Sequence, residues 1–320
     1  MILKRVLDFL TGKKEGSPIQ MVPVGLGSTS TSVPVAVLHG NRPGKTLLVT
    51  GGTDGDEYAG MEAAYAIVER FADGDFAGKI VVIPVLNMPG YLDECSQNPL
   101  DQRFPKMVFP GKVNGTPTER MMHWLVSGYA NHADAWIDLH GGAITEGLHP
   151  FLWLYESGVP AVDLLAQTFL RSSGADTVVF EKVGAGSKAG TLAGRGCLYA
   201  IAESGERGCR TDEDVSRHVG WTVALMAAMG MVDAPTETPR ESQPKVLRRA
   251  AIVSVPYEGI WYPADLSDPT VEKGMRLGIC VRLDGTGSRE IVAPSDGTVL
   301  WWKQTMAMRQ GDVLVALGME

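Results

Sequence analysis

The sequence has few cysteines, and none of them form a recognisable pair. Cys95, Cys197, Cys209 and Cys280 are scattered, and the chain has no Cys-x-x-Cys motif. Disulfide scaffolds and thiolate zinc knuckles both need several cysteines at short, regular spacing, so neither is indicated. Unpaired thiols are typical of the reducing cytoplasm, which is the location we expect.

Long apolar runs and an excess of positive charge are also absent. No apolar run approaches the roughly 20 residues that a membrane-spanning helix needs. The first ten residues, MILKRVLDFL, are too short and too charged for a secretory leader. The formal net charge of −8 argues against nucleic acid or an anionic membrane surface as the main partner. We therefore expect no nucleic-acid partner and no membrane association.

The composition is that of a globular protein. Hydrophobic residues make up 44% and charged residues 21% of the 320 positions, enough for one large domain or two unequal ones. Residues 233–244 have the proline and polar content of a linker. Beyond it, only short strands divided by Gly, Pro and Asp turns are indicated. We therefore predict a first domain at 1–235 and a smaller all-β domain, a barrel or a sandwich, at 245–320.

The first region predicts an α/β fold, with a mixed, mostly parallel sheet flanked by helices. Continuous apolar strands that alternate with helices are typical of parallel sheets buried on both faces. A segment rich in Pro and Gly, 87–115, is long enough to be either functional or disordered. Strands are expected at 19–24, 33–38, 46–49, 80–87, 135–140, 151–154, 177–180 and 197–203, and helices at 61–68, 117–129, 160–171 and 215–229.

One stretch, Val49 to Gly60, joins an apolar strand to a helix and carries two notable acidic side chains. Asp54 and Glu57 are three residues apart where the helix should begin, so their carboxylates can lie on one face. The glycines around them let the chain turn sharply and leave room for a ligand near the main chain. Converging carboxylates suggest a cation site, but aspartate is also an ordinary helix cap. The stretch alone favours neither interpretation.

Two further residues end strands at the same predicted edge of the sheet. His140 closes one apolar strand and Glu203 closes another. Ligands of open α/β sheets bind beyond the carboxyl ends of the strands. Asp54, Glu57 and His140 are acceptable metal ligands, and Glu203 is then free to be a general base. A lone histidine is more often structural, but four strand-end residues together favour a metal site.

These motifs, in this order, resemble the succinylglutamate desuccinylase/aspartoacylase family, a branch of the zinc carboxypeptidase-like hydrolases. In that family a Gly-x-His-Gly-(Asp/Asn)-Glu motif supplies two zinc ligands, and residues 52–57 read Gly-Thr-Asp-Gly-Asp-Glu. Asp-Leu-His-Gly-Gly at 138–142 matches the motif of the third ligand. Glu-Ser-Gly at 203–205 matches the motif of the catalytic glutamate. The resemblance runs from about residue 47 to the C-terminus.

The resemblance implies a role for each of these residues. Asp54, Glu57 and His140 would hold the metal, expected to be zinc, and Glu203 would be the catalytic base. The implied enzyme is a metal-dependent amidohydrolase, or deacylase, that acts on a carbon–nitrogen bond other than a peptide bond. Its substrate would be a small N-acylated amine or amino acid, and a homo-oligomer stays open.

Two departures from the family pattern bear on this site. Asp54 stands where the family has its first zinc-binding histidine, and two carboxylate ligands move the metal preference towards manganese or iron. Phe-Pro-Lys-Met at 104–107 replaces Asp-Leu-Asn-Arg, whose Asn and Arg grip the substrate carboxylate. Arg103, Lys106 and Arg195 are candidates for the missing substrate-binding charge, although each also fits an ordinary solvated position.

The same departures suit a second class of function, a catalytically inactive member that binds a small molecule or a partner protein. Retention of Glu57, His140 and Glu203 favours the hydrolase. An esterase or a carboxypeptidase is a weaker third option, because no peptide subsite can be recognised. The altered segment 104–107 predicts a substrate that differs from N-acetylaspartate and succinylglutamate near its carboxylate.

Overall fold

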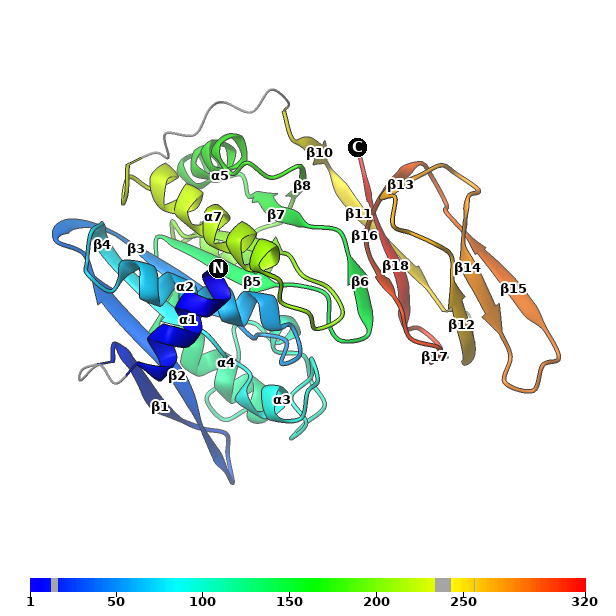
Figure 1. Ribbon diagram of the computed structural model, residues 1–320, viewed down its shortest axis with the longest axis horizontal. Helices are drawn as coiled ribbons and strands as arrows, with labels where there is room; N and C mark the ends of the chain where they lie inside the picture. The colour runs from blue at the N-terminus through cyan, green and yellow to red at the C-terminus, as the bar shows by residue number, and fades with distance from the viewer. Residues whose placement is uncertain (13–16, 234–242, 256) are drawn as a thin grey trace.

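The computed structural model describes residues 1–12, 17–233, 243–255 and 257–320. Most of the predicted linker, 234–242, lies outside the described residues. An α/β body forms one side of the molecule and antiparallel β-structure forms the other, as Figure 1 shows. The predicted fold class is confirmed. No helix in the described part of the chain is long and apolar enough to cross a membrane.

Nine strands form the central sheet of the α/β body, in the order β1-β2-β4-β3-β5-β9-β7-β8-β10. Strands β4, β3, β5 and β9 run parallel to one another, whereas β7 is antiparallel to β9. The carboxyl ends of β3, β5 and β9 therefore meet at one edge. The strands are β1 (Ile19–Gly25), β2 (Ser30–His39), β3 (Arg42–Gly51), β4 (Ala77–Ile83), β5 (Ala135–His140), β7 (Phe151–Glu156), β8 (Thr177–Lys182), β9 (Leu198–Glu203) and β10 (Lys245–Leu247).

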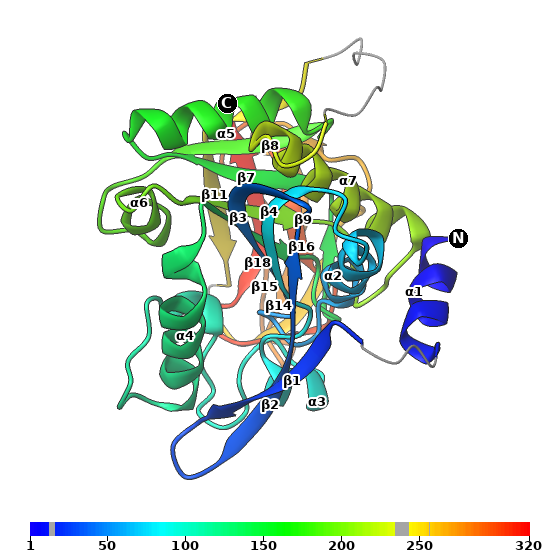
Figure 2. The same ribbon diagram turned by 90° about the vertical axis from the view of Figure 1, so that its left-hand side faces the viewer.

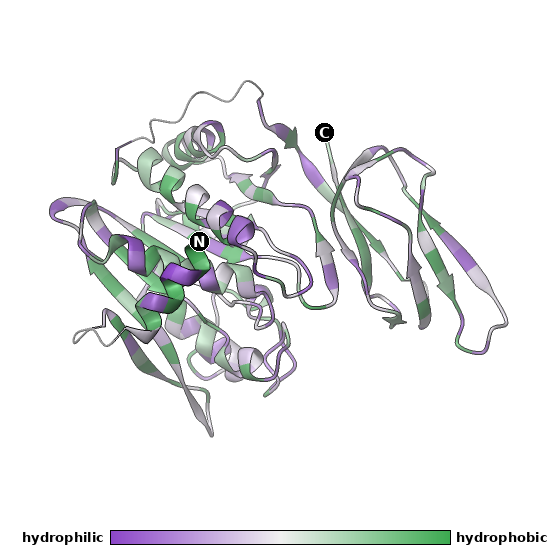
Figure 3. Ribbon diagram, viewed as in Figure 1, coloured by the Kyte–Doolittle hydropathy of each residue, from purple (hydrophilic) through white to green (hydrophobic). Residues whose placement is uncertain are grey.

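Helices cover both faces of this sheet, which is why its central strands are apolar on both sides. Figure 2 shows α4 and α6 on one face and α1, α2 and α7 on the other. In Figure 3, apolar residues follow the strands, while the helices carry both apolar and polar positions. The helices are α1 (Ile2–Thr11), α2 (Tyr58–Phe71), α3 (Met88–Leu92), α4 (Pro117–Gly128), α5 (Pro160–Ser172), α6 (Lys188–Ala193) and α7 (Asp212–Ala228).

The C-terminal region consists of two antiparallel sheets that share one apolar core. Trp261 and Leu277 from one sheet pack with Val299 and Leu314 from the other, the sandwich form of the two predicted alternatives. Its strands are β11 (Arg249–Ser254), β12 (Gly259–Pro263), β13 (Thr270–Val271), β14 (Arg276–Val281), β15 (Ser288–Val292), β16 (Gly297–Lys303), β17 (Ala307–Met308) and β18 (Val313–Met319).

Two short strands cross the predicted boundary between the regions. Strand β6 (Glu146–Leu148) leaves the α/β body and pairs with β16 of the sandwich. Strand β10 belongs to the predicted second domain but pairs with β8 of the large sheet. The division into 1–235 and 245–320 stays a prediction. Backbone pairing across it holds the sandwich beside the carboxyl ends of the central strands.

Candidate metal centre and cavity

A glycine-rich turn carries the chain from β3 into α2. Gly52 adopts a φ of +59°, which side chains rarely adopt. A Cβ on Gly55 would lie 2.2 Å from the backbone carbon of Gly90, so only glycine fits there. Helix α2 begins after Glu57, and the Glu57 side chain does not form a capping hydrogen bond with it. The turn therefore folds Asp54 and Glu57 back towards the end of the neighbouring strand, β5.

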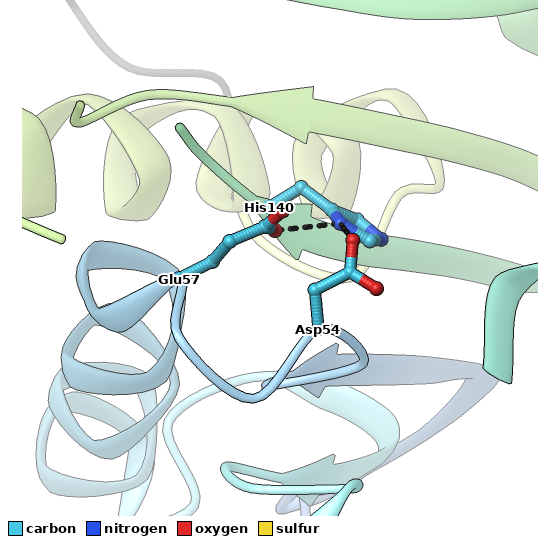
Figure 4. Close-up of side chains that lie close together, drawn as sticks. All are labelled: Asp54, Glu57 and His140. Atoms are coloured by element: carbon cyan, nitrogen blue, oxygen red, sulfur yellow. Dashed lines mark hydrogen bonds and ion pairs between the residues drawn. The ribbon is translucent and has the colours of Figure 1, made fainter. Parts of the chain in front are cut away.

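Asp54, Glu57 and His140 meet at this edge and are called the Asp–Glu–His cluster below (Figure 4). Nδ1 of His140 lies 2.8 Å from Oε2 of Glu57 and 3.6 Å from Oδ2 of Asp54. The three possible ligand atoms all lie within 4.8 Å of one another, and all three residues are buried. The structure thus brings together the three predicted metal ligands.

The donor set fits a divalent cation. Oδ1 of Asp54 is buried and has no hydrogen-bond partner among the described residues. An orphaned, buried carboxylate oxygen is costly unless something binds it. Two carboxylates and one imidazole are ligands that zinc, manganese and iron accept. The alternative of a simple helix cap does not fit Asp54, because its carboxylate faces Lys106 and His140.

Asp138 holds His140 from the opposite side. The two residues are two positions apart on β5, so their side chains lie on the same face of the strand. Oδ2 of Asp138 lies 3.3 Å from Nε2 of His140. Asp138 also accepts hydrogen bonds from the hydroxyls of Thr50, Thr53 and Tyr199, at 2.6, 2.7 and 3.0 Å. The imidazole is thereby fixed with Nδ1 towards Glu57 and Asp54.

Opposite charges dominate the electrostatics of the cluster. Burial and the Asp54 carboxylate raise the pKa of Glu57 well above its usual value. Burial alone would raise the pKa of Asp54, but Lys106 and His140 outweigh it and hold that pKa well below its usual value. For His140, the carboxylates of Asp138 and Glu57 outweigh burial and raise the pKa. The carboxylates thus stabilise positive charge on His140 and on Lys106, whose pKa they also raise.

Glu203 ends β9 directly opposite His140 in the β5–β9 ladder. It lines the same cavity as Glu57, His140 and Lys106. Burial raises the pKa of Glu203 to about 7, although His140 and Lys106 act in the other direction. A carboxyl group with a pKa near neutrality can both accept and return a proton, as a general base requires.

The three predicted substrate-binding cations lie in different places. Nζ of Lys106 reaches the cavity and forms an ion pair with Oδ2 of Asp54. Arg103 instead lies 3.2 Å from Glu119, and Arg195 donates to the side chain of Asn131. Neither arginine is among the described residues that line the cavity. Lys106 is therefore the predicted cation that the structure brings to the site.

The cavity, of about 370 Å³, is closed on one side by stacked aromatic rings. Trp153 stacks on Tyr155, and Tyr155 on Tyr199, with ring centroids 6.3 and 6.0 Å apart. Trp301, from β16 of the sandwich, lies 6.3 Å from Trp153 and lines the cavity as well. These four residues, called the aromatic wall below, show that both regions of the molecule shape one pocket.

Several residues of this pocket had no predicted role. Glu146, on β6, lines the cavity, and burial raises the pKa of its carboxyl group. Lys188 begins α6, lies 3.6 Å from Asp138 and 4.0 Å from the ring centroids of Trp136 and Tyr199. Neither stands in a recognised motif: Glu146 is placed by the β6–β16 ladder, and Lys188 reaches Asp138 from α6. Asp138 belongs to the Asp-Leu-His-Gly-Gly motif, but the sequence did not predict its contacts with His140 and Thr50.

Comparison with known proteins agrees with this arrangement. A model of the succinylglutamate desuccinylase/aspartoacylase catalytic domain matches residues 43–228. The N-alpha-acetyl-L-2,4-diaminobutyric acid deacetylase of Halomonas elongata is 31% identical over 119 residues, which are 37% of this chain. The matched part is 34% of that protein's own length, about a third of it.

Solved structures share the fold over nearly the whole chain. A succinylglutamate desuccinylase/aspartoacylase from Rhodobacter sphaeroides superimposes with a TM-score of 0.81 at 22% identity, covering 94% of each chain. The product-bound ectoine utilization protein EutE (DoeB) from Ruegeria pomeroyi has a TM-score of 0.77 at 21% identity. It covers 96% of this chain and 100% of its own. At these identities the likeness establishes the fold.

Proposed function

We propose that this chain, which belongs to the succinylglutamate desuccinylase/aspartoacylase family, is a metal-dependent deacylase. Its reaction would be hydrolysis of the amide bond of a small N-acylated amine or amino acid. The observation that carries the proposal is the buried Asp–Glu–His cluster, with an orphaned oxygen on Asp54 and Glu203 on the adjacent strand. Two of the proposed ligands, Glu57 and His140, and the proposed base Glu203 line one cavity, which supports the proposal.

Asp54, Glu57 and His140 would hold the cation. Zinc is the first candidate, and the two carboxylates also suit manganese or iron. When bound, a divalent cation supplies a Lewis acid that polarises the scissile carbonyl and lowers the pKa of a water molecule. Asp138 keeps His140 oriented for this role, since it fixes the ring from the side of Nε2.

Glu203 is the proposed general base. Its carboxylate would take a proton from the attacking water and return it to the leaving amine nitrogen. With a pKa raised to about 7 by burial, the group holds a proton readily at the end of the step. Lys106, which also faces the cavity, would stabilise negative charge on the substrate.

The substrate would combine a small acyl group with an amine that the aromatic wall can cover. The cavity of about 370 Å³ suits a small molecule. The Halomonas relative is named for an acetylated diamino acid, and we take that class as the first to test. The substrate is also expected to differ near its carboxylate from N-acetylaspartate and succinylglutamate, since Lys106 and Met107 replace the usual clamp.

The first experiment is elemental analysis of protein purified without added metal, with Asp54→Ala and His140→Ala beside it. About one equivalent of metal, lost from both variants, is expected. Release of amine would then be followed with N-α-acetyl-2,4-diaminobutyrate, N-acetylaspartate and N-succinylglutamate. A wild type that takes up neither zinc nor manganese would overturn the hydrolase and favour a catalytically inactive binding protein. The expected cytoplasmic location and the oligomeric state stay predictions.

A further inference from the structure

The two positions that depart from the family pattern touch each other. Lys106 lies in the short helical turn Pro105–Met107, and its Nζ forms an ion pair with Oδ2 of Asp54. The ammonium group also lies 5.5 Å from the ring centroid of Phe104, so an aromatic ring supports its position. A new negative charge in the cluster is thus matched by a positive charge from the loop.

The ion pair is unequal in its exposure to solvent. The Asp54 side chain is fully buried, whereas 43% of the Lys106 side chain is exposed. The Lys106 side chain therefore has access to solvent, whereas the Asp54 carboxylate has none. A buried carboxylate such as Asp54 is costly without a positive partner. Lys106 supplies that partner from a position that is open to solvent.

Of the other positively charged groups nearby, Lys188 pairs with a different carboxylate and His140 is itself a proposed metal ligand. Lys188 lies behind His140, 3.6 Å from Asp138, and His140 shares its Nδ1 between Glu57 and Asp54. Lys106 pairs with Oδ2 of Asp54, which is also the oxygen that lies 3.6 Å from Nδ1 of His140 and therefore faces the cluster. A divalent cation and the Lys106 ammonium would both need that side of the carboxylate, and like charges a few ångströms apart repel each other.

We propose that Lys106 and a divalent cation compete for Asp54, and that Lys106 is the built-in counter-ion of the metal-free site. The lysine lowers the metal affinity of the Asp–Glu–His cluster and keeps its carboxylates compensated until metal binds. The inference rests on the proposed function in one respect only, the existence of a metal-bound state.

A neighbouring ion pair offers a matched control. Lys112 lies in the same loop and 3.2 Å from Glu119, but its side chain is 73% exposed and it does not approach the cluster. Removing its charge tests for general effects of lysine loss in this segment. Lys106→Met and Lys112→Met remove the same charge from the same loop, but only Lys106→Met removes it from the cluster, and Glu119 keeps its ion pair with Arg103.

The first test is the dissociation constant for zinc and for manganese, measured by competition with a chromophoric chelator. Lys106→Met is expected to bind at least about tenfold more tightly than the wild type, because one nearby positive charge is gone. Lys112→Met is expected to bind within about twofold of the wild type, because exposed charges contribute little. Equal or weaker metal binding by Lys106→Met would overturn the competition.

The second test is the melting temperature in excess chelator. Lys106→Met is expected to melt at least about 2 °C below the wild type, because the buried Asp54 carboxylate then loses its lysine partner. The same substitution should cost less in an Asp54→Asn background, where that charge is absent. An equal loss in both backgrounds would show a merely structural lysine and overturn the proposal.

The outcomes separate this inference from the proposed function. Equal metal affinity in the wild type and Lys106→Met would leave the metal-dependent deacylase intact and remove only the competition. Absence of metal binding in every variant would remove both. Tighter binding by Lys106→Met, together with its loss of stability in chelator, would establish both the metal site and its counter-ion.

Discussion

The two sides of the cavity are built from different chemistry, and strand β9 contributes to both. The Asp–Glu–His cluster and Glu203 come from the ends of neighbouring parallel strands and carry charge. The aromatic wall comes from β7, β9 and β16 and carries rings and little charge. The comparison suggests a division of labour, with reaction on the charged side and selection of the substrate on the aromatic side.

The sharpest test of that division is Glu203→Gln. Loss of the proposed base is expected to lower kcat by about 10²- to 10⁴-fold, while metal content stays unchanged. Steady-state kinetics on the best substrate, with elemental analysis of the same sample, would measure both. Glu206→Gln is the matched control, because Glu206 follows Glu203 by three residues, is not among the described residues that line the cavity, and pairs with Arg207. A comparable loss in the control would move the base away from Glu203.

Asp138→Asn tests the charged side through its support. The substitution removes the carboxylate that faces His140 and leaves Lys188 without its charged partner. We expect a loss of about 3 kcal/mol in the free energy of unfolding, measured by urea denaturation, because a buried charge is then uncompensated. Asp284→Asn, in an exposed turn of the sandwich, should change it little. Equal stability of the two variants would contradict a supporting role.

His218 predicts a dependence of stability on pH. Burial lowers the pKa of His218 to about 4, from 6.5, while its Nε2 contacts the carbonyl of Ser204, next to Glu203. The unfolded chain therefore takes up the proton first, and stability falls as the pH drops from about 6.5 to 4. The expected loss is about 3 kcal/mol in the free energy of unfolding.

Urea denaturation across this range, with His218→Gln beside the wild type, measures the contribution of His218. The variant should show a shallower decline, because it has no imidazole to protonate. Parallel profiles for the two proteins would assign the acid sensitivity to other groups.

Trp301→Ala tests the aromatic side and should have the smallest effect. Loss of this ring is expected to raise KM by about three- to tenfold, roughly 1 kcal/mol of binding, with kcat within twofold. Tyr262→Ala is the control, because Tyr262 is half exposed on the same sandwich and does not line the cavity. A fall in kcat as large as that of Glu203→Gln would end the distinction between the two sides.

The charged side could be predicted from the sequence because its rules are local. Asp54 and Glu57 lie within one turn, and the ends of parallel strands meet at one edge regardless of the loops between them. His140 and Glu203 followed from that rule. The fold class followed in the same way, from apolar strands alternating with helices.

The aromatic side could not be predicted, because distant pairings create it. Trp153 and Trp301 lie side by side where the β6–β16 ladder crosses the predicted domain boundary. The charge of Arg103 and Arg195 did not reveal where their side chains would lie, and both interact with residues outside the cavity. The segment Ile2–Thr11 was considered only as a leader, but it is a helix whose Val6 is buried in the core.

The pairing of β6 with β16 makes the C-terminal sandwich a part of the pocket and not a separate appendage. The ladder sets Trp301 opposite Leu148, and both residues line the cavity. A sandwich grafted from a related protein would therefore replace part of the pocket's lining while leaving β3, β5 and β9 intact. Removing the sandwich would instead leave strand β6 without its partner, and exposed strand edges promote aggregation.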